Sequence, residues 1–238
     1  MVESQLDNSP STSMASIQKL DAPQNLTVLA YDSIKRYILE GNLDQDTRLT
    51  EEYLSSQLGI SKSPVREALI SLQTEGLIRI EPRRGTFLRR FTLQEVKDLY
   101  DLRETLEVYA VSIAEISPQL LAELRESVER TREFVRSGDK IGHIEEDMKF
   151  HGLIAQAGGN SELCRLLANI QNQIWLCRCK TYSLSSSTAA AAHLTIVDAV
   201  CANDRQAAQE CMREHISLVR NRLMNYMAEK ALGEAFEG

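Results

Sequence analysis

The chain has 238 residues, 43% of them hydrophobic, so it is long enough for two modest domains that each bury a core. Its net charge of −7 and its aromatic content of only 5% argue against a protein that coats nucleic acid or stacks single-stranded bases. Charge is unevenly distributed, however. Residues 61–90 carry seven basic and three acidic side chains, a balance of +4, whereas residues 91–238 sum to −6. One basic patch on an acidic chain is typical of a protein that contacts phosphate at a single place.

Three features of the sequence predict a cytoplasmic protein with no membrane partner. No stretch approaches the roughly 20 apolar residues that span a bilayer. The N-terminus has no basic segment followed by an apolar one, as a secretory signal would. The cysteines are odd in number and show no C-x-x-C spacing, which indicates reduced thiols. They are Cys164, Cys177, Cys179, Cys201 and Cys211.

The first elements along the chain are a tail and a helix. Residues 1–24 are rich in Ser, Asn, Asp and Pro and show no periodicity, so they predict a disordered tail, and Met14 is an alternative start. From Leu26 apolar residues recur at helical spacing, and Gly41 is a natural stop.

The next segment predicts two short helices and a hairpin. Thr50 is a candidate N-cap, and Gly59 ends the first short helix. Ser61 or Ser63 can cap the second, which ends near Gly76. Two β-prone runs, 77–81 and 86–90, then flank a Pro/Gly turn. Residues 25–91 are therefore predicted to form a winged helix-turn-helix.

The remaining residues, 92–238, contain one proline and helical periodicity throughout. The fold class predicted is mainly α, with an N-terminal winged helix-turn-helix and a C-terminal all-helical antiparallel bundle. The helices of the bundle are expected near 93–115, 118–137, 139–157, 160–182, 186–202 and 204–232.

The second short helix has the features of a DNA-reading helix. Its inner stripe is apolar, and its exposed N-terminal positions are polar or basic, as entry into the major groove requires. Arg66 is the best candidate for a base contact, because a guanidinium can bind guanine through two hydrogen bonds. On composition alone, an ordinary helix pair with a solvated basic face is the alternative. The candidate DNA contacts are Ser61, Lys62, Ser63 and Arg66 on the helix, with Arg83 and Arg84 on the wing.

The run LGISKSPVREAL at residues 58–69, followed by Leu72, Glu75-Gly76-Leu77 and Arg84-Gly85, resembles the GntR family of bacterial regulators. The resemblance spans about residues 26–91 and implies DNA contacts at Ser61, Lys62, Ser63, Arg66 and Gly85. The sequence departs from the family at three places. Lys62 replaces the usual Arg and weakens any bidentate contact, and Glu52 stands where some members carry Arg. Asp46-Thr47 replaces the usual Pro-Gly of the turn.

The sequence holds only four histidines, at positions 143, 151, 193 and 215. Asp147 and His151 are four residues apart and so share a helix face. Together with His193 and His215 they could hold Zn²⁺ or another divalent metal ion. From spacing alone, the alternative is that these are surface groups or core groups satisfied without metal.

Five segments of the second half, in order, resemble the FCD ligand-binding domain of FadR-type GntR regulators, over most of residues 92–222. Metal-binding members use one Asp and three His at the matching places, so the resemblance implies a divalent ion, zinc first and otherwise nickel or manganese. Its ligands would be Asp147, His151, His193 and His215, with His143 and Cys211 as possible extra ligands. The matching segments are 98–107, 147–151, 159–160, 193–199 and 212–215.

The effector is expected to be a small carboxylate or sugar acid that fills open coordination positions of the metal. Arg103 could hold its anionic end, and Asn160 could hydrogen-bond to it. The alternatives are an ion pair of Arg103 with Glu107 and a helix-capping role for Asn160. Trp175 is expected in core or dimer packing more than in ligand stacking.

The function predicted is that of a metabolite-responsive regulator that binds an inverted-repeat operator in double-stranded DNA as a homodimer. The resemblance to the family implies that it is a repressor, relieved by its effector. One alternative is a regulator whose helical domain binds effector without metal. A remote alternative is a metal-dependent hydrolase. No further general base lies in a recognisable motif, so no enzyme activity is expected.

Overall fold

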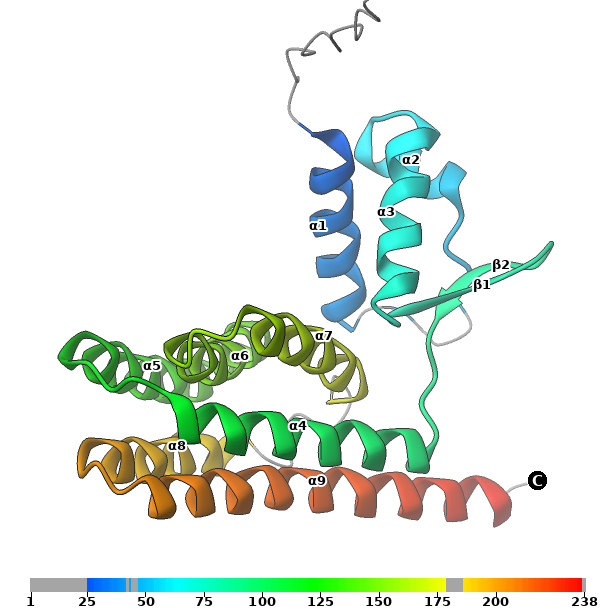
Figure 1. The fold of residues 1–238 in the computed structure, drawn as a ribbon. Helices are drawn as coiled ribbons and strands as arrows, with labels where there is room; N and C mark the ends of the chain where they lie inside the picture. The colour runs from blue at the N-terminus through cyan, green and yellow to red at the C-terminus, as the bar shows by residue number, and fades with distance from the viewer. Residues whose placement is uncertain (1–24, 42, 44–46, 179–185, 237–238) are drawn as a thin grey trace, which may run out of the picture.

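The computed structural model describes residues 25–41, 43, 47–178 and 186–236. The predicted tail and Asp46 of the altered turn lie outside these residues. In Figure 1 a small upright unit stands above a broad layer of helices. Each part has its own hydrophobic core, one within residues 30–88 and one within residues 96–223.

The upright unit begins with three helices: α1 (Leu26–Leu39), α2 (Glu51–Leu58) and α3 (Lys62–Thr74). Thr50 caps α2 as expected, because its side chain accepts from the backbone N–H of Tyr53 at 3.1 Å. Gly59 ends α2 in the left-handed region at φ +65°, which a side chain would disfavour. The inner faces of α1 and α3 pack together over a shared apolar core.

The wing is a two-stranded antiparallel hairpin of β1 (Ile78–Glu81) and β2 (Gly85–Leu88). The backbone N–H of Leu49 donates to the Thr86 carbonyl at 2.8 Å and so ties the segment before α2 to the wing. Gly85 has φ +122°, and a Cβ there would collide with the Arg48 side chain. The predicted winged helix-turn-helix is thereby confirmed.

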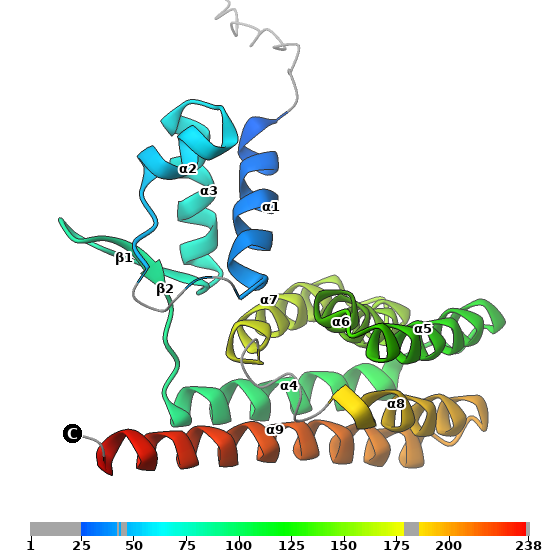
Figure 2. The same cartoon turned by 180° about the vertical axis from the view of Figure 1, so that it is seen from behind.

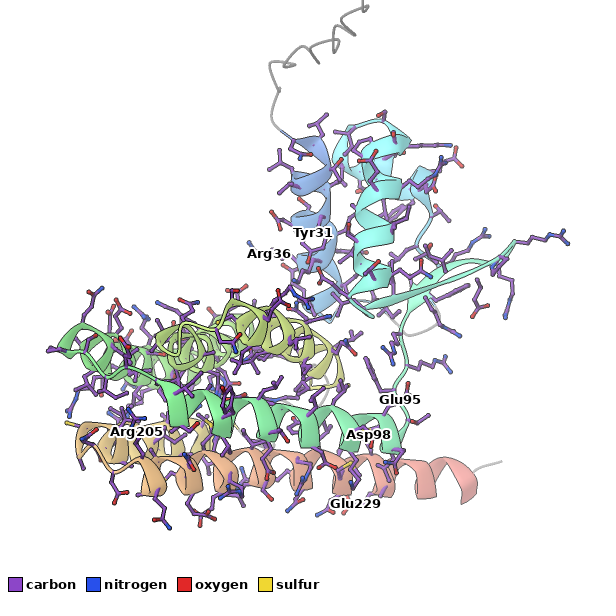
Figure 3. All side chains as sticks on the ribbon, viewed as in Figure 1. Tyr31, Arg36, Glu95, Asp98, Arg205 and Glu229 are labelled. Atoms are coloured by element: carbon purple, nitrogen blue, oxygen red, sulfur yellow. The ribbon has the colours of Figure 1, made fainter. Side chains whose placement is uncertain are left out.

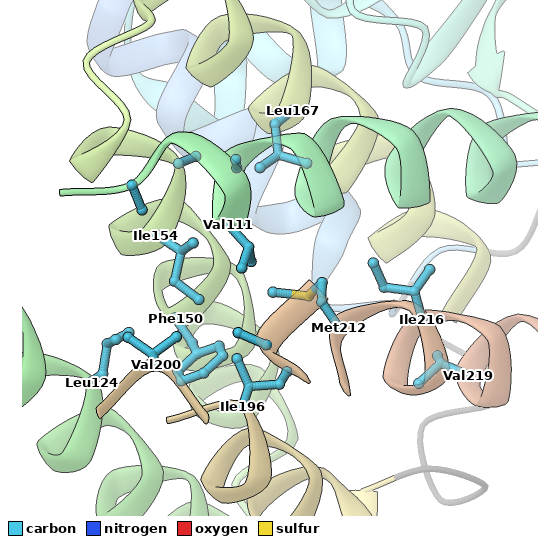
Figure 4. Packing of buried hydrophobic residues seen from close by; sticks show 14 of the residues in the cluster. Val111, Leu124, Phe150, Ile154, Leu167, Ile196, Val200, Met212, Ile216 and Val219 are labelled. Atoms are coloured by element: carbon cyan, nitrogen blue, oxygen red, sulfur yellow. The ribbon is translucent and has the colours of Figure 1, made fainter. Parts of the chain in front are cut away.

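Within the described residues, the second part consists of six helices: α4 (Leu93–Ile113), α5 (Pro118–Ser137), α6 (Lys140–Ala157), α7 (Ser161–Arg178), α8 (Ser186–Cys201) and α9 (Arg205–Phe236). The long helices α4 and α9 lie side by side and run in opposite directions in both views (Figures 1 and 2). In the core, Phe150 of α6, Ile196 of α8 and Met212 of α9 lie close to one another (Figure 4). The predicted mainly α fold is confirmed.

The helix ends follow the sequence signals closely. Ser117 caps α5, and Gly138 ends it at φ +74°. The last helix runs to Phe236, beyond the expected end near 232. The helix expected over 160–182 is seen from Ser161 to Arg178, and the rest of that prediction falls in 179–185, outside the described residues.

None of the helices in the described ranges is both long and apolar enough to cross a bilayer. Cys164, Cys201 and Cys211 are free thiols, whereas Cys179 lies outside the described residues.

Helix α7 is the main contact between the two parts, and it lies beneath the end of α1 in both views (Figures 1 and 2). Trp175 of α7 forms a small apolar cluster with Leu39 of α1 and Ile144 of α6. Beside it, Arg89 donates to Gln173 at 3.3 Å and to Glu95 at 2.9 Å; Glu95 lies at the start of α4 (Figure 3). Trp175 is thus in core packing, as expected, although the packing joins two units.

Candidate nucleic-acid interface and metal centre

The N-terminus of α3 presents the predicted DNA-contacting side chains. Ser61 occupies the N-cap position with an extended backbone, but its hydroxyl makes no capping hydrogen bond. Lys62 and Arg66 remain 55% and 61% exposed at their side chains. Val65 and Leu69 on the opposite face are buried and anchor the helix. The local geometry therefore leaves a polar, basic helix end turned to solvent.

Carboxylates of α2 hold the two basic side chains of this surface. Arg66 donates from Nε at 2.8 Å and from Nη2 at 2.6 Å to the two oxygens of Glu51. This hydrogen bonding lowers the pKa of Glu51 below its usual range. Lys62 lies 3.7 Å from Glu52. Both pairs are solvent-exposed and so contribute little to stability, which means that DNA can replace them at small cost.

The wing carries further basic side chains. Arg83 adopts φ +63° at the turn, and Arg84 pairs with Glu81 at 2.7 Å while its side chain stays 76% exposed. Side chains at the tip of the hairpin extend away from the rest of the molecule in Figure 3. Arg83, Arg84 and Gly85 therefore lie together at the wing's tip, apart from the end of α3.

A second cluster lies inside the helical part. Asp147 and His151 come from α6, His193 from α8 and His215 from α9, and all four are buried. One ligand atom from each lies within 4.8 Å of the other three. The Nε2 atoms of His151 and His215 are 3.3 Å apart, and Nε2 of His193 is 3.4 Å from Oδ1 of Asp147.

These separations suit a metal ion. A tetrahedral zinc site with bonds of about 2.05 Å has ligands about 3.3 Å apart. Nδ1 of His193 lacks a hydrogen-bond partner among the described residues, and Nε2 faces only the Asp147 carboxylate at 3.4 Å, which leaves a buried polar side chain poorly satisfied unless something else binds it. The cluster could therefore hold a divalent ion.

The electrostatics of the cluster also favour a cation. Burial lowers the pKa of His193, and burial with the neighbouring imidazoles holds the pKa of His215 well below its usual value. Burial would raise the pKa of Asp147, but Arg178 and the histidines outweigh it and hold that pKa well below its usual range. At neutral pH His193 and His215 are thus neutral and Asp147 is ionised, the states in which these groups bind metal.

Two residues support the cluster from outside, and sequence reasoning did not give them this role. Glu107 contacts Nδ1 of His151 with one oxygen and accepts from Nε of Arg103 at 2.5 Å with the other. Arg178 donates to Oδ2 of Asp147 at 3.0 Å. Glu107 was detectable as the partner of Arg103 four residues earlier, but nothing local in the sequence pointed to Arg178.

The two predicted effector contacts lie in different environments. Arg103 is 1% exposed and makes the ion pair with Glu107 that was its alternative role. Its Nη2 has no hydrogen-bond partner among the described residues. Asn160 is exposed, and its side chain accepts from the backbone N–H of Leu163 at 3.0 Å, which is its alternative capping role.

The two possible extra ligands are not part of the cluster of four. His143 is buried one turn before Asp147, and burial lowers its pKa to about 4. Cys211 is half-buried, and burial raises the pKa of its thiol.

Both parts of the chain match known protein families. Residues 26–88 match the model described as "Bacterial regulatory proteins, gntR family", and residues 98–218 match the FCD domain. The uncharacterized HTH-type transcriptional regulator YdhC of Bacillus subtilis is 28% identical, over 84% of this chain and 91% of its own length.

A second relative and a solved structure are also similar to this chain. A protein of Paenarthrobacter nicotinovorans, the probable D-xylose utilization operon transcriptional repressor, is 28% identical over 78% of this chain and 83% of its own. The solved structure of E. coli McbR/YncC has a TM-score of 0.76 at 23% identity, covers 85% of this chain and 98% of its own, and so shares the fold.

Proposed function

The chain belongs to the GntR family of bacterial transcriptional regulators and carries an FCD domain, and from this premise we propose a metabolite-responsive repressor. It binds an inverted-repeat operator in double-stranded DNA as a homodimer, because two-fold symmetry of the protein matches that of such a site. The expectation that the chain is not an enzyme agrees with its relatives, which are regulators. We place the protein in the cytoplasm and the division between its two domains near residue 91.

DNA recognition is assigned to the end of α3 and to the wing. Arg66 reads a base edge, and Lys62 with the hydroxyls of Ser61 and Ser63 binds phosphate. The wing residues Arg83, Arg84 and Gly85 contact the minor groove or the adjacent backbone. These DNA-contact assignments are supported by the exposed basic surface described above, which lies within the residues that match the gntR family.

Effector sensing is assigned to the buried cluster. One observation carries this assignment: four ligand atoms from three helices converge at one point. Asp147, His151, His193 and His215 would hold zinc, or otherwise nickel or manganese, all of which accept imidazole and carboxylate ligands. A divalent ion supplies a Lewis-acid centre to which an effector carboxylate can attach. Arg103 holds the anionic end of the effector.

A contribution of Asn160 to the effector site remains a prediction, and its present capping bond gives it no support. The alternative of an effector bound without metal stays open, because Arg103 and Arg178 could hold an acid on their own. Metal analysis of the purified protein separates the two.

A thermal-shift screen tests the proposed function. Small carboxylates and sugar acids, each with and without added zinc, are expected to yield a ligand that raises the melting temperature only when metal is present. At a ligand concentration about 100 times Kd, the stabilisation is about 2.7 kcal/mol, or several degrees. A ligand that stabilises the protein equally after chelation would favour the metal-free alternative.

Glu107→Gln is expected to weaken metal affinity about 10- to 100-fold, as removal of an outer-shell partner of a ligating histidine usually does. The substitution keeps the size of the side chain but removes the charge that faces Nδ1 of His151. Competition with a chromophoric chelator measures the change. Glu104→Gln is the matched control, since Glu104 lies on the same helix and pairs with Arg213 and Arg220 outside the cluster. Equal affinities for the two variants would contradict the assigned role of Glu107.

A further inference from the structure

A small pocket lies between the buried cluster and the contact between the two parts. It has a volume of about 10 Å³, enough for about one water molecule. Its polar lining comes from α4, α6 and α7, and its apolar wall includes Ile144, Met148 and Ile174. The polar residues that line it are Arg103, Asp147, Gln171, Trp175 and Arg178.

Three of these residues carry buried donors that lack a hydrogen-bond partner among the described residues. They are Nη2 of Arg103, Nε2 of Gln171 and Nε1 of Trp175. The residues themselves are 1%, 6% and 7% exposed. Buried polar groups are almost always satisfied, so three orphan donors around one cavity call for an acceptor.

The chemistry of the lining selects a carboxylate as that acceptor. An indole N–H and a guanidinium can only donate, and the amide nitrogen of Gln171 is a donor as well. The lining carries two positive charges, on Arg103 and Arg178, against one negative charge on Asp147. Arg103 already pairs with Glu107 and Arg178 with Asp147, so charge alone does not select the ligand. A carboxylate is favoured because its two acceptor oxygens can take all three donors, and the bond from Arg103 is charge-assisted.

We propose that Arg103, Gln171 and Trp175 form a subsite for an effector carboxylate next to Asp147. This inference rests on the proposed function and deepens it: α7 becomes part of the effector site, and the effector is an acid with a further oxygen group for the metal. The subsite lies against the unit that binds DNA, because Trp175 also packs on Leu39 at the end of α1. A carboxylate larger than water shifts the indole and so disturbs this packing.

Trp175 is the single tryptophan of the chain, so its fluorescence reports directly on the subsite. The experiment titrates full-length protein with formate, the smallest carboxylate, at constant ionic strength set with chloride. We expect a saturable change in emission. Gln171→Leu should weaken the apparent affinity about tenfold, because it removes a charge-assisted donor and keeps a similar volume.

Gln173→Leu is the matched control: it changes the same residue type two positions further along α7, where Gln173 accepts from Arg89 outside the cavity. An absent response in the wild type, or equal affinities in the two variants, would overturn the subsite. Metal content is measured on the same samples. A formate response that depends on Gln171 in metal-free protein would keep the subsite and refute the metal site. If the protein contains bound metal and Gln171→Leu does not change the formate affinity, the metal site is supported and the subsite is refuted.

Discussion

His193→Ala is expected to leave the purified protein without its metal ion. His193 is fully buried, its Nδ1 has no hydrogen-bond partner among the described residues, and its Nε2 lies 3.4 Å from Oδ1 of Asp147. Loss of a direct ligand should weaken binding by more than the roughly 10- to 100-fold expected for an outer-shell change. Elemental analysis after dialysis should give about one ion per wild-type chain and almost none in the variant.

The same loss should lower stability. An ion held at about 1,000 times its Kd contributes about 4 kcal/mol to folding, which corresponds to a melting temperature about 10 °C higher. After chelation, the melting temperature of the wild type should therefore fall close to that of the variant, as measured by circular dichroism.

His143→Ala is the control, because His143 is equally buried and lies on the same helix as Asp147 but outside the cluster of four. It should keep its metal even if it is less stable. A His193→Ala protein that retains a full equivalent of metal, or a His143→Ala protein that loses it, would refute the assigned ligand set.

Arg66→Ala is expected to weaken binding to operator DNA about ten- to a hundredfold, the usual effect of removing a base-reading arginine. The fold should be unaffected, because the side chain is exposed and pairs with Glu51 only at the surface. Duplexes selected by the wild-type protein from a random pool provide the operator, and fluorescence anisotropy gives the affinity. The selected sequences should contain an inverted repeat.

Arg36→Ala is the matched control, since Arg36 is an exposed arginine on α1 that pairs with Glu40, away from the end of α3 (Figure 3). Light scattering should give twice the chain mass of 26.8 kDa for the wild type and both variants. If Arg66→Ala and Arg36→Ala bind operator with the same affinity as the wild type, Arg66 does not read DNA.

Most of the fold could be predicted because its signals are local. Thr50, Gly59 and Gly138 act within one turn of their own helices, so caps and stops are visible in the sequence. The end of the helix that contains Trp175 could not be placed in the same way, because no glycine or proline follows it. The ion pair between Arg66 and Glu51 was also missed, since it depends on how closely α2 approaches α3.

The sequence by itself predicted the candidate residues for DNA reading and for metal binding. The run at residues 58–69 and the rarity of histidine are properties of composition and spacing, and they need no tertiary information. Only the tertiary structure decided what surrounds those residues. His151 and His215 are 64 positions apart, and their contact depends on the packing of α6 against α9. The partners Glu107 and Arg178, and the position of Trp175 between two units, follow from many weak contacts between helices, which no local pattern encodes.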